Sequence, residues 1–147
     1  MKRFRCVLVD WDYVYGLCKK LADKIHLAGY KPDLIVALAR GGWFAGRVLC
    51  DLLAVKDLVS LKVEHWGITA TPDGEARIKF PFSFNLCGRR VLVVDDITDT
   101  GKSLRVATNY LRSLNPAELR TATLQRIKTS SFVPDFYAEE IEWVWVV

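Results

Sequence analysis

The sequence has no long hydrophobic run and little glycine or proline. Its longest apolar stretches, around 34–39 and 91–94, are far shorter than the roughly 18 residues of a membrane span. Asp10 and Asp12 interrupt the apolar run near the N-terminus, so we expect no signal peptide. Nine glycines and five prolines, with 51% hydrophobic residues, exclude collagen-like, low-complexity and disordered chains. We therefore expect a single domain over residues 1–147, in the cytoplasm and without membrane contact.

Clustered cysteines and runs of one charge are also missing. The four cysteines are widely spaced and form no Cys-x-x-Cys pair: Cys6, Cys18, Cys50 and Cys87. This spacing predicts buried thiols in a reducing compartment, and favours them over a zinc site or a disulfide framework. The net charge is only +4, and no Lys/Arg run resembles a nucleic-acid tail. The charge permits a phosphate-bearing ligand, and we expect no nucleic-acid partner.

Strand-like and helix-like segments alternate along the chain. Strands are expected over 4–9, 34–38, 58–63, 90–95 and 118–124, and helices over 11–28, 43–53 and 103–114. Asp10 is the expected N-cap of the first helix, Gly29 its end, and Phe44, Val48 and Leu52 the buried side of the second. The segment 65–82 has no clear periodicity and predicts a functional or mobile loop. The alternation predicts an α/β fold, with a mostly parallel twisted sheet, helices on both faces, and ligands at the carboxyl ends of the strands.

The most informative segment runs from Val91 to Leu104. Four apolar residues lead to Asp95 and Asp96, two adjacent acids at a strand end, whose repulsion would be relieved by hydroxyl groups or a divalent cation. The polar turn 98–103 opens directly into a helix, so backbone N–H groups, hydroxyls and the helix dipole converge as an anion pocket. A nucleotide P-loop fails on spacing, because Asp96 stands where its first glycine is required. The alternative is a capped helix after a buried strand, with both acids simply solvated.

Asp95–Ser103, with its apolar strand, resembles the phosphoribosyl-pyrophosphate signature of the type I phosphoribosyltransferases, and in detail that of the 6-oxopurine branch. Val36–Gly42 is similar to the pyrophosphate loop of that family, and Gln125–Val147 to its base-binding hood. The resemblance therefore implies one phosphoribosyltransferase domain with a small C-terminal hood, formed mainly by 125–147 and the N-terminal segment.

The resemblance also implies a role for each matching residue. Asp95 and Asp96 would face the ribose hydroxyls, directly or through bound Mg²⁺, and Asp99 would act as general acid/base near purine nitrogen 7. The 5-phosphate would lie among Thr98, Asp99, Thr100, Gly101, Lys102 and Ser103, and the pyrophosphate against Ala39, Arg40, Gly41 and Gly42. Alternatively, Asp99 is a helix-capping turn residue and Arg40 a plain surface residue. In relatives the peptide before the glycines is sometimes cis, which makes Ala39–Arg40 a candidate.

The base site implied by the resemblance lies near the chain end. It comprises Lys128, Trp143, Val144, Trp145 and Val146. Lys128 would donate to the 6-oxygen of the base, with Arg126 as the alternative donor. One tryptophan would stack on the purine, and we favour Trp145 over Trp143, although both could instead pack in a core. The 65–82 loop would close over the site, with Arg77 and Lys79 as candidate contacts.

The activity implied by the resemblance is transfer of a phosphoribosyl group. The substrates would be phosphoribosyl pyrophosphate and a 6-oxopurine base, the cofactor Mg²⁺, and the assembly a homo-oligomer such as a dimer. Two alternatives stay open: the same chemistry on another base, and a non-catalytic regulator of the same fold that senses phosphoribosyl pyrophosphate. A regulator that binds nucleic acid would need a basic face, which the scattered charges do not favour.

Overall fold

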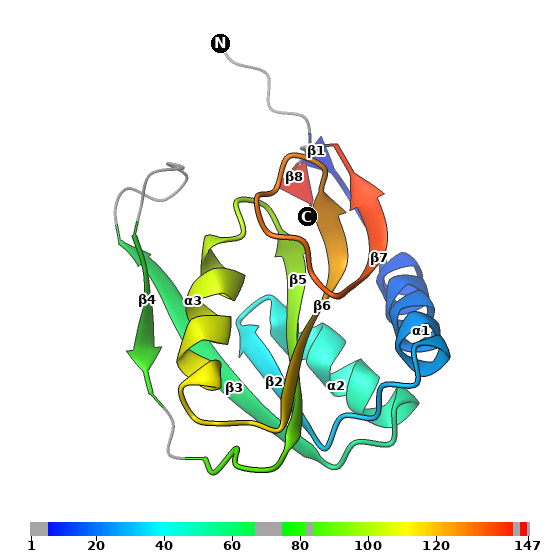
Figure 1. Cartoon of the computed structure of the whole chain (residues 1–147). Coiled ribbons are helices and arrows are strands. Elements are labelled where there is room, and N and C mark those ends of the chain that lie inside the picture. The colour runs from blue at the N-terminus through cyan, green and yellow to red at the C-terminus, as the bar shows by residue number, and fades with distance from the viewer. Residues whose placement is uncertain (1–5, 67–74, 82–83, 143–144, 147) are drawn as a thin grey trace.

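A six-stranded sheet in the order β4-β3-β2-β5-β6-β7 organises the protein (Figure 1). The computed structural model describes residues 6–66, 75–81, 84–142 and 145–146. The elements are β1 (Cys6–Val7), α1 (Trp11–Leu27), β2 (Leu34–Ala39), α2 (Gly42–Leu52), β3 (Asp57–Trp66), β4 (Glu75–Phe80), β5 (Arg90–Thr98), α3 (Lys102–Arg112), β6 (Glu118–Ile127), β7 (Phe136–Ile141) and β8 (Trp145–Val146). All neighbouring strands of this sheet are parallel except β3 and β4. The predicted α/β class is confirmed.

Helices cover both faces of the sheet. On one face, α1 and α2 pack on strand residues such as Ile35 and Leu92, which are fully buried. On the other, α3 packs through Leu104 and Leu111 on a second cluster that includes Val93. Strand side chains alternate between the two clusters because successive residues of a strand point to opposite faces. This two-sided burial explains the near-continuous apolar runs in β2 and β5.

The ends of α1 follow the sequence signals. The Asp10 side chain accepts a hydrogen bond from the Tyr13 N–H at 2.8 Å and caps the helix. The helix ends at Leu27, and Gly29 follows with φ of +68°, a conformation that glycine adopts at no steric cost. Both predictions are confirmed.

The predicted buried side of α2 is correct only in part. Val48 and Leu52 are partly buried and pack against the core, but Phe44 is 36% exposed, and the buried residues are Gly42, Ala45, Gly46, Leu49 and Cys50. The reason is close packing: a Cβ on Gly46 would lie 3.0 Å from the Ala37 Cβ, so the helix presents its smallest side chains to the sheet.

The predicted 65–82 loop is also wrong in part, because strands occupy its two ends. β3 continues to Trp66, and β4 pairs with it antiparallel. Within β4, Ala76 and Ile78 pack on the α3-side cluster, whereas Lys79 forms an ion pair with Glu64 at 2.7 Å. This period-two pattern is typical of an edge strand. The rest of the predicted loop, 67–74 with 82, lies outside the described residues.

A separate two-stranded parallel sheet joins the two ends of the chain. β1 pairs with β8 in the register Cys6 to Trp145 and Val7 to Val146. Of the predicted strand 4–9, the described residues therefore form a strand only at Cys6–Val7, and this strand lies outside the main sheet. Strand β7 was not predicted. Cys18 and Cys50 are buried thiols, but Cys87 is exposed, contrary to the prediction. Among the described residues, no helix combines the length and apolar character needed to cross a membrane.

Candidate functional site

Two predicted loops meet at the carboxyl ends of β2 and β5. The chain passes from β2 through α2 to β3 on one side, and from β5 through α3 to β6 on the other. The strand order therefore reverses between β2 and β5, and such a switch point is where open parallel sheets bind ligands. The loop after β2 is Ala39–Gly42, and the segment after the buried part of β5 is Asp95–Ser103.

Glycine is required where these two loops touch. A Cβ added to Gly41 would lie 2.3 Å from Oδ2 of Asp96, and one added to Gly42 would lie 2.4 Å from the carbonyl oxygen of Val94. The predicted pyrophosphate loop is thus in direct contact with one of the predicted ribose-binding acids. The Ala39–Arg40 peptide, the candidate that the resemblance suggested, is cis, and the Arg40 side chain is exposed.

The two acids are held in place by local backbone bonds. Asp95 Oδ1 accepts from the Asp96 N–H at 3.0 Å, and Asp96 Oδ1 accepts from the Ile97 N–H at 2.7 Å. Burial, and then the negative charge of Asp96, raise the pKa of Asp95 well above its usual value. Because the site holds this charge at a cost, hydroxyl groups or a cation that compensate it would bind favourably.

A divalent cation at these acids would need further oxygen ligands. Within the described part of the chain, no group of three or more His, Cys, Asp and Glu side chains is arranged to hold a metal ion. Two carboxylates with the remaining ligands from water and from substrate oxygens are the donor set that Mg²⁺ accepts. Asp95 and Asp96 therefore fit a cation that arrives together with a phosphate-bearing ligand.

The turn between β5 and α3 has the features of an anion site. Gly101, the N-cap of α3, has φ of +80° and no side chain of its own to cap the helix, and the Lys102 N–H donates to the Thr100 hydroxyl at 3.4 Å. The N-terminal N–H groups of a helix, with its dipole, favour a negatively charged ligand. Thr98 is 2% exposed, whereas Asp99 is exposed.

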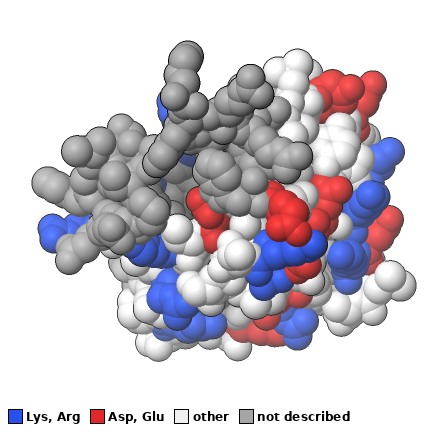
Figure 2. Space-filling model, turned by 90° about the horizontal axis from the view of Figure 1, so that it is seen from above, with Lys and Arg blue, Asp and Glu red and all other residues white. Residues whose placement is uncertain are grey.

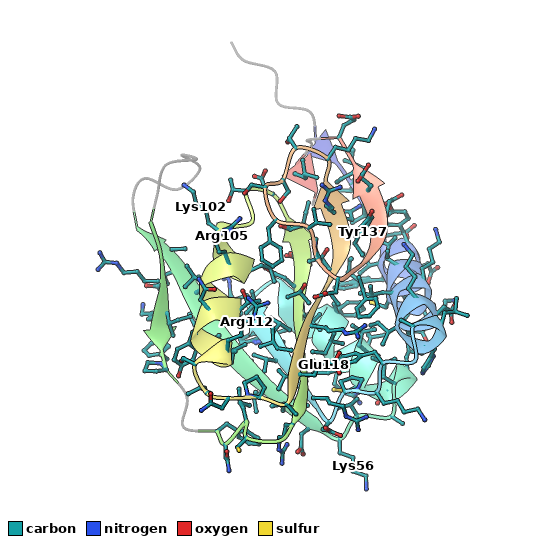
Figure 3. All side chains as sticks on the ribbon, in the orientation of Figure 1. Lys56, Lys102, Arg105, Arg112, Glu118 and Tyr137 are labelled. Carbon is teal, nitrogen blue, oxygen red and sulfur yellow. The ribbon has the colours of Figure 1, made fainter. Side chains whose placement is uncertain are left out.

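Two basic side chains lie close to this turn. Lys102 and Arg105 lie at the N-terminal end of α3, and Arg112 lies at its other end (Figure 3). On the face seen in Figure 2, described Lys and Arg side chains are interspersed with Asp and Glu. The described part of this face thus lacks a continuous basic patch that would suit a nucleic-acid backbone.

A cavity of about 430 Å³ opens beside the acids. It is lined by Val9, Trp11, Tyr13, Val14, Leu17, Gly41, Phe44, Ala45, Asp96, Ile97, Asp99, Leu124, Gln125 and Ile127. Its volume lies in the range of small-molecule sites, and such sites typically combine apolar walls with a few polar groups. Its polar residues include Asp96, Asp99, Gln125 and Tyr13.

Sequence reasoning missed most of this cavity. The rings of Trp11 and Phe44 lie 4.8 Å apart and form one wall. Gln125 donates to Glu139 at 3.1 Å and to the Tyr13 hydroxyl at 3.4 Å, and Tyr13 donates to Glu139. Only the long-range packing of α1 against β6 and β7 brings these groups together, so no local motif could have identified them.

The residues predicted to bind the base are not gathered in the same way. Lys128 is exposed and forms an ion pair with Glu142 at 2.7 Å, which raises the pKa of Lys128. Lys128 is outside the set that lines the cavity. Arg126, the alternative donor, pairs with Glu140. Trp143 and Val144 lie outside the described residues, and Trp145 and Val146 are described only as the backbone of β8.

A strand–turn–helix turn, paired acids and a glycine loop at one switch point define an α/β protein whose site is suited to a phosphorylated, hydroxyl-bearing ligand. A family model for the phosphoribosyl transferase domain matches residues 8–147. The chain belongs to this family.

Individual relatives give the same result. The solved purine phosphoribosyltransferase of Pyrococcus horikoshii is 30% identical with a TM-score of 0.85, over 98% of this chain and 92% of that one. Xanthine phosphoribosyltransferase 1 of Saccharomyces cerevisiae is 24% identical over 122 residues, and the match covers 70% of this chain and 58% of that protein. The hypoxanthine-guanine phosphoribosyltransferase of the same yeast is 25% identical over 120 residues, with coverage of 70% of this chain and 53% of that protein. The chain thus spans little more than half the length of these two curated relatives.

Proposed function

We propose that the protein transfers the 5-phosphoribosyl group of 5-phospho-α-ribose 1-diphosphate to a 6-oxopurine base and releases pyrophosphate. The observation that carries this proposal is the contact between Gly41 and the Asp96 carboxylate. It joins a glycine loop suited to a diphosphate with an acid suited to ribose hydroxyls. The helix-opening turn 98–103 follows Asp96 directly in the chain and provides for the 5-phosphate.

The ligand would be divided among three groups of residues. Asp95 and Asp96 accept hydrogen bonds from the ribose hydroxyls or hold the cation. The 5-phosphate is bound by N–H and hydroxyl groups of Thr98, Asp99, Thr100, Gly101, Lys102 and Ser103. The diphosphate lies against Ala39, Arg40, Gly41 and Gly42, where the exposed Arg40 guanidinium offers several donors to phosphate oxygens.

Mg²⁺ fits the paired acids. Asp95 and Asp96 would hold it, and the burial that raises the pKa of Asp95 is a cost that a cation would offset. When bound, Mg²⁺ neutralises the charge of the departing diphosphate oxygens. The chain's own part is to fix the two carboxylates at the end of β5, which it does through the backbone bonds of Asp96 and Ile97.

We assign the base to the cavity beside Asp99. Its apolar walls suit a flat heteroaromatic ring, and Asp99 and Gln125 offer hydrogen-bonding groups at its edge. As the bond between the anomeric carbon and the base nitrogen forms and the bond to the diphosphate breaks, Asp99 takes up the proton of the ring N–H. The relatives named for xanthine, hypoxanthine and guanine support a 6-oxopurine as the base.

The hood would complete the base site. In this proposal, Lys128 leaves its partner Glu142 to donate to the 6-oxygen of the base. One tryptophan of the segment formed by Trp143, Val144, Trp145 and Val146 stacks on the ring. The Trp43 side chain, which is 51% exposed and does not line the cavity, is available to an interface between two copies. A homodimer is therefore expected.

The test is a pyrophosphate-release assay with hypoxanthine, guanine, xanthine, adenine and uracil, with and without Mg²⁺. We expect turnover with at least one 6-oxopurine, none with adenine or uracil, and loss of turnover in EDTA. Asp99→Asn should lower kcat by roughly 10²- to 10⁴-fold, whereas Asp23→Asn, an exposed acid on α1 outside the cavity, should not. Preference for adenine or uracil, or an Asp99→Asn enzyme as fast as Asp23→Asn, would contradict the proposal.

A further inference from the structure

The turn that follows β6, residues 128–132, packs directly on the turn that opens α3. Ser131 Oγ donates to the carbonyl oxygen of Thr100 at 2.9 Å. The hydroxyls of Ser130 and Thr98 lie 3.2 Å apart and share a hydrogen bond, with Ser130 only 7% exposed. Two neighbouring serines thus hold two alternate residues of the proposed phosphate-binding turn.

Phe132 also packs against the turn that opens α3. A Cβ on Gly101 would lie 2.2 Å from the Phe132 Cβ, so the glycine backbone rests against this residue. The Arg105 guanidinium lies 5.9 Å from the Phe132 ring and donates to the Ser131 carbonyl at 3.4 Å. The first turn of α3 and the 128–132 turn are therefore packed as one unit.

The 128–132 turn is itself well anchored. The Ser130 N–H donates to the Ile127 carbonyl at 2.9 Å, and the Lys128 N–H donates to the Ile141 carbonyl at 3.0 Å. Ser130 Oγ also donates to the Phe132 carbonyl at 3.1 Å. Because β6 and β7 fix the position of the 128–132 turn, this turn can in turn hold the residues that it contacts in place.

The bond to Thr100 has a specific geometric consequence. In a trans peptide unit, the C=O and the following N–H point in opposite directions. By donating to the Thr100 carbonyl oxygen, the Ser131 hydroxyl holds that oxygen toward the 128–132 turn. The N–H of Gly101 consequently points away from that turn, and the Gly101 backbone packs against Phe132.

We propose that Ser131, with Ser130 and Phe132, forms a positioning set that presents the Gly101 N–H to the 5-phosphate. The inference rests on the proposed function, because it takes the 98–103 turn as the phosphate site. These residues act through the turn and not by touching the reacting atoms. Loss of the Ser131 hydroxyl removes one hydrogen bond and frees the Thr100–Gly101 peptide to rotate, so affinity for the phosphate should fall by about 3- to 10-fold.

The experiment compares Ser131→Ala with Ser113→Ala by calorimetric titration of ribose 5-phosphate into the full chain. Ser113 is the matched control, because its hydroxyl also donates to a backbone carbonyl, that of Tyr110 at 2.6 Å, at the opposite end of α3. We expect a 3- to 10-fold weaker dissociation constant for Ser131→Ala, no change for Ser113→Ala, and recovery in Ser131→Thr, which keeps the hydroxyl. Titration of the purine base alone should not distinguish the variants, and both should melt within about 2 °C of the parent.

The outcomes separate this inference from the proposed function. If the parent protein does not bind ribose 5-phosphate, the phosphate site itself is wrong and both proposals fail. If the parent binds but Ser131→Ala and Ser113→Ala bind equally well, only the positioning role is refuted. A Ser131→Ala protein that loses affinity in proportion to a lowered melting temperature, or that loses affinity for the base equally, would reduce Ser131 to a structural residue and also refute it.

Discussion

Replacement of Gly41 by alanine tests the site through one methyl group. The new Cβ would lie 2.3 to 2.5 Å from three atoms of the Asp96 carboxylate, whereas ordinary contacts begin at 3.4 Å. The carboxylate must therefore shift by about 1 Å. A misplacement of about 1 Å in a catalytic site can cost roughly 100-fold in rate, so we expect kcat/KM for phosphoribosyl pyrophosphate to fall by about that factor.

The same substitution should leave the fold nearly unchanged. Gly41 has φ of −56° and ψ of −39°, which alanine adopts without strain. The clash falls on the end of a side chain that can rotate, and the loss of backbone freedom in the unfolded chain favours alanine by a few tenths to 1 kcal/mol. We expect the free energy of unfolding to stay within about 1 kcal/mol of the parent value, as measured by urea denaturation.

The neighbouring glycine provides the contrast. Gly42→Ala would bring its Cβ within 2.4 Å of the Val94 carbonyl, a backbone atom of the central strand that cannot rotate away. This variant should be destabilised by about 1 to 3 kcal/mol. Gly16→Ala, inside α1 and with no atom within 4 Å of the added Cβ, is the control, which should keep full activity and gain about 0.5 to 1 kcal/mol of stability. Full activity in Gly41→Ala, or equal destabilisation of Gly41→Ala and Gly42→Ala, would refute the reasoning that Gly41 serves the position of Asp96.

Two further predictions concern titration and reactivity. Burial and the charge of Asp96 raise the pKa of Asp95 in the folded state. The protonated Asp95 carboxyl therefore contributes stability that is fully present below its unfolded pKa and is lost as the pH rises through the raised pKa. We expect Asp95→Asn to lose activity but to melt higher than the parent at pH 7 in metal-free buffer, with a smaller difference at pH 4. An equal or lower melting temperature at pH 7 would show that the charge is not held at a cost. Burial raises the pKa of Cys18 to about 11, and Cys50 is also buried, whereas Cys87 is exposed. In a Cys6→Ser variant, iodoacetamide at pH 8 should therefore modify one thiol in the native protein and three thiols in urea, as counted by intact mass. Rapid native labelling of Cys18 would contradict the packing of α1.

Structural features that depend on one continuous segment of the chain could be predicted from the sequence. The strand before Asp95, the turn and α3 are adjacent in the chain, and their apolar spacing and glycine follow local rules. The face of α2 could not be predicted in this way, because apolar residues lie on more than one side of that helix. The choice depends on how closely the helix approaches β2, and that distance selects Gly42, Ala45 and Gly46. Strand β4 was missed because its alternation covers only a few residues and one face of it is exposed.

The contact between Gly41 and Asp96, which carries the proposed function, could not be predicted from one segment of the sequence. The two residues are 55 positions apart in the chain. They touch because β2 and β5 are neighbours in the sheet, with Leu34 opposite Val91. A sequence that alternates strands and helices predicts a parallel sheet but leaves the strand order open. Once the order places β2 beside β5, the two loops must meet, since parallel neighbours end at the same edge.

The same argument explains why the base side is the least local part of the site. The phosphate turn is built by the end of one strand and the start of the next helix, but most of the cavity wall comes from α1, α2 and β6. Each of these three elements contributes only two to four side chains, outside the predicted motifs, and the predicted loops add Gly41, Asp96, Ile97 and Asp99. Substitutions such as Tyr13→Phe or Gln125→Leu should therefore alter the choice and affinity of the base while leaving the affinity for ribose 5-phosphate unchanged. A parallel loss of both affinities would show that cavity and phosphate turn are not separate parts of the site.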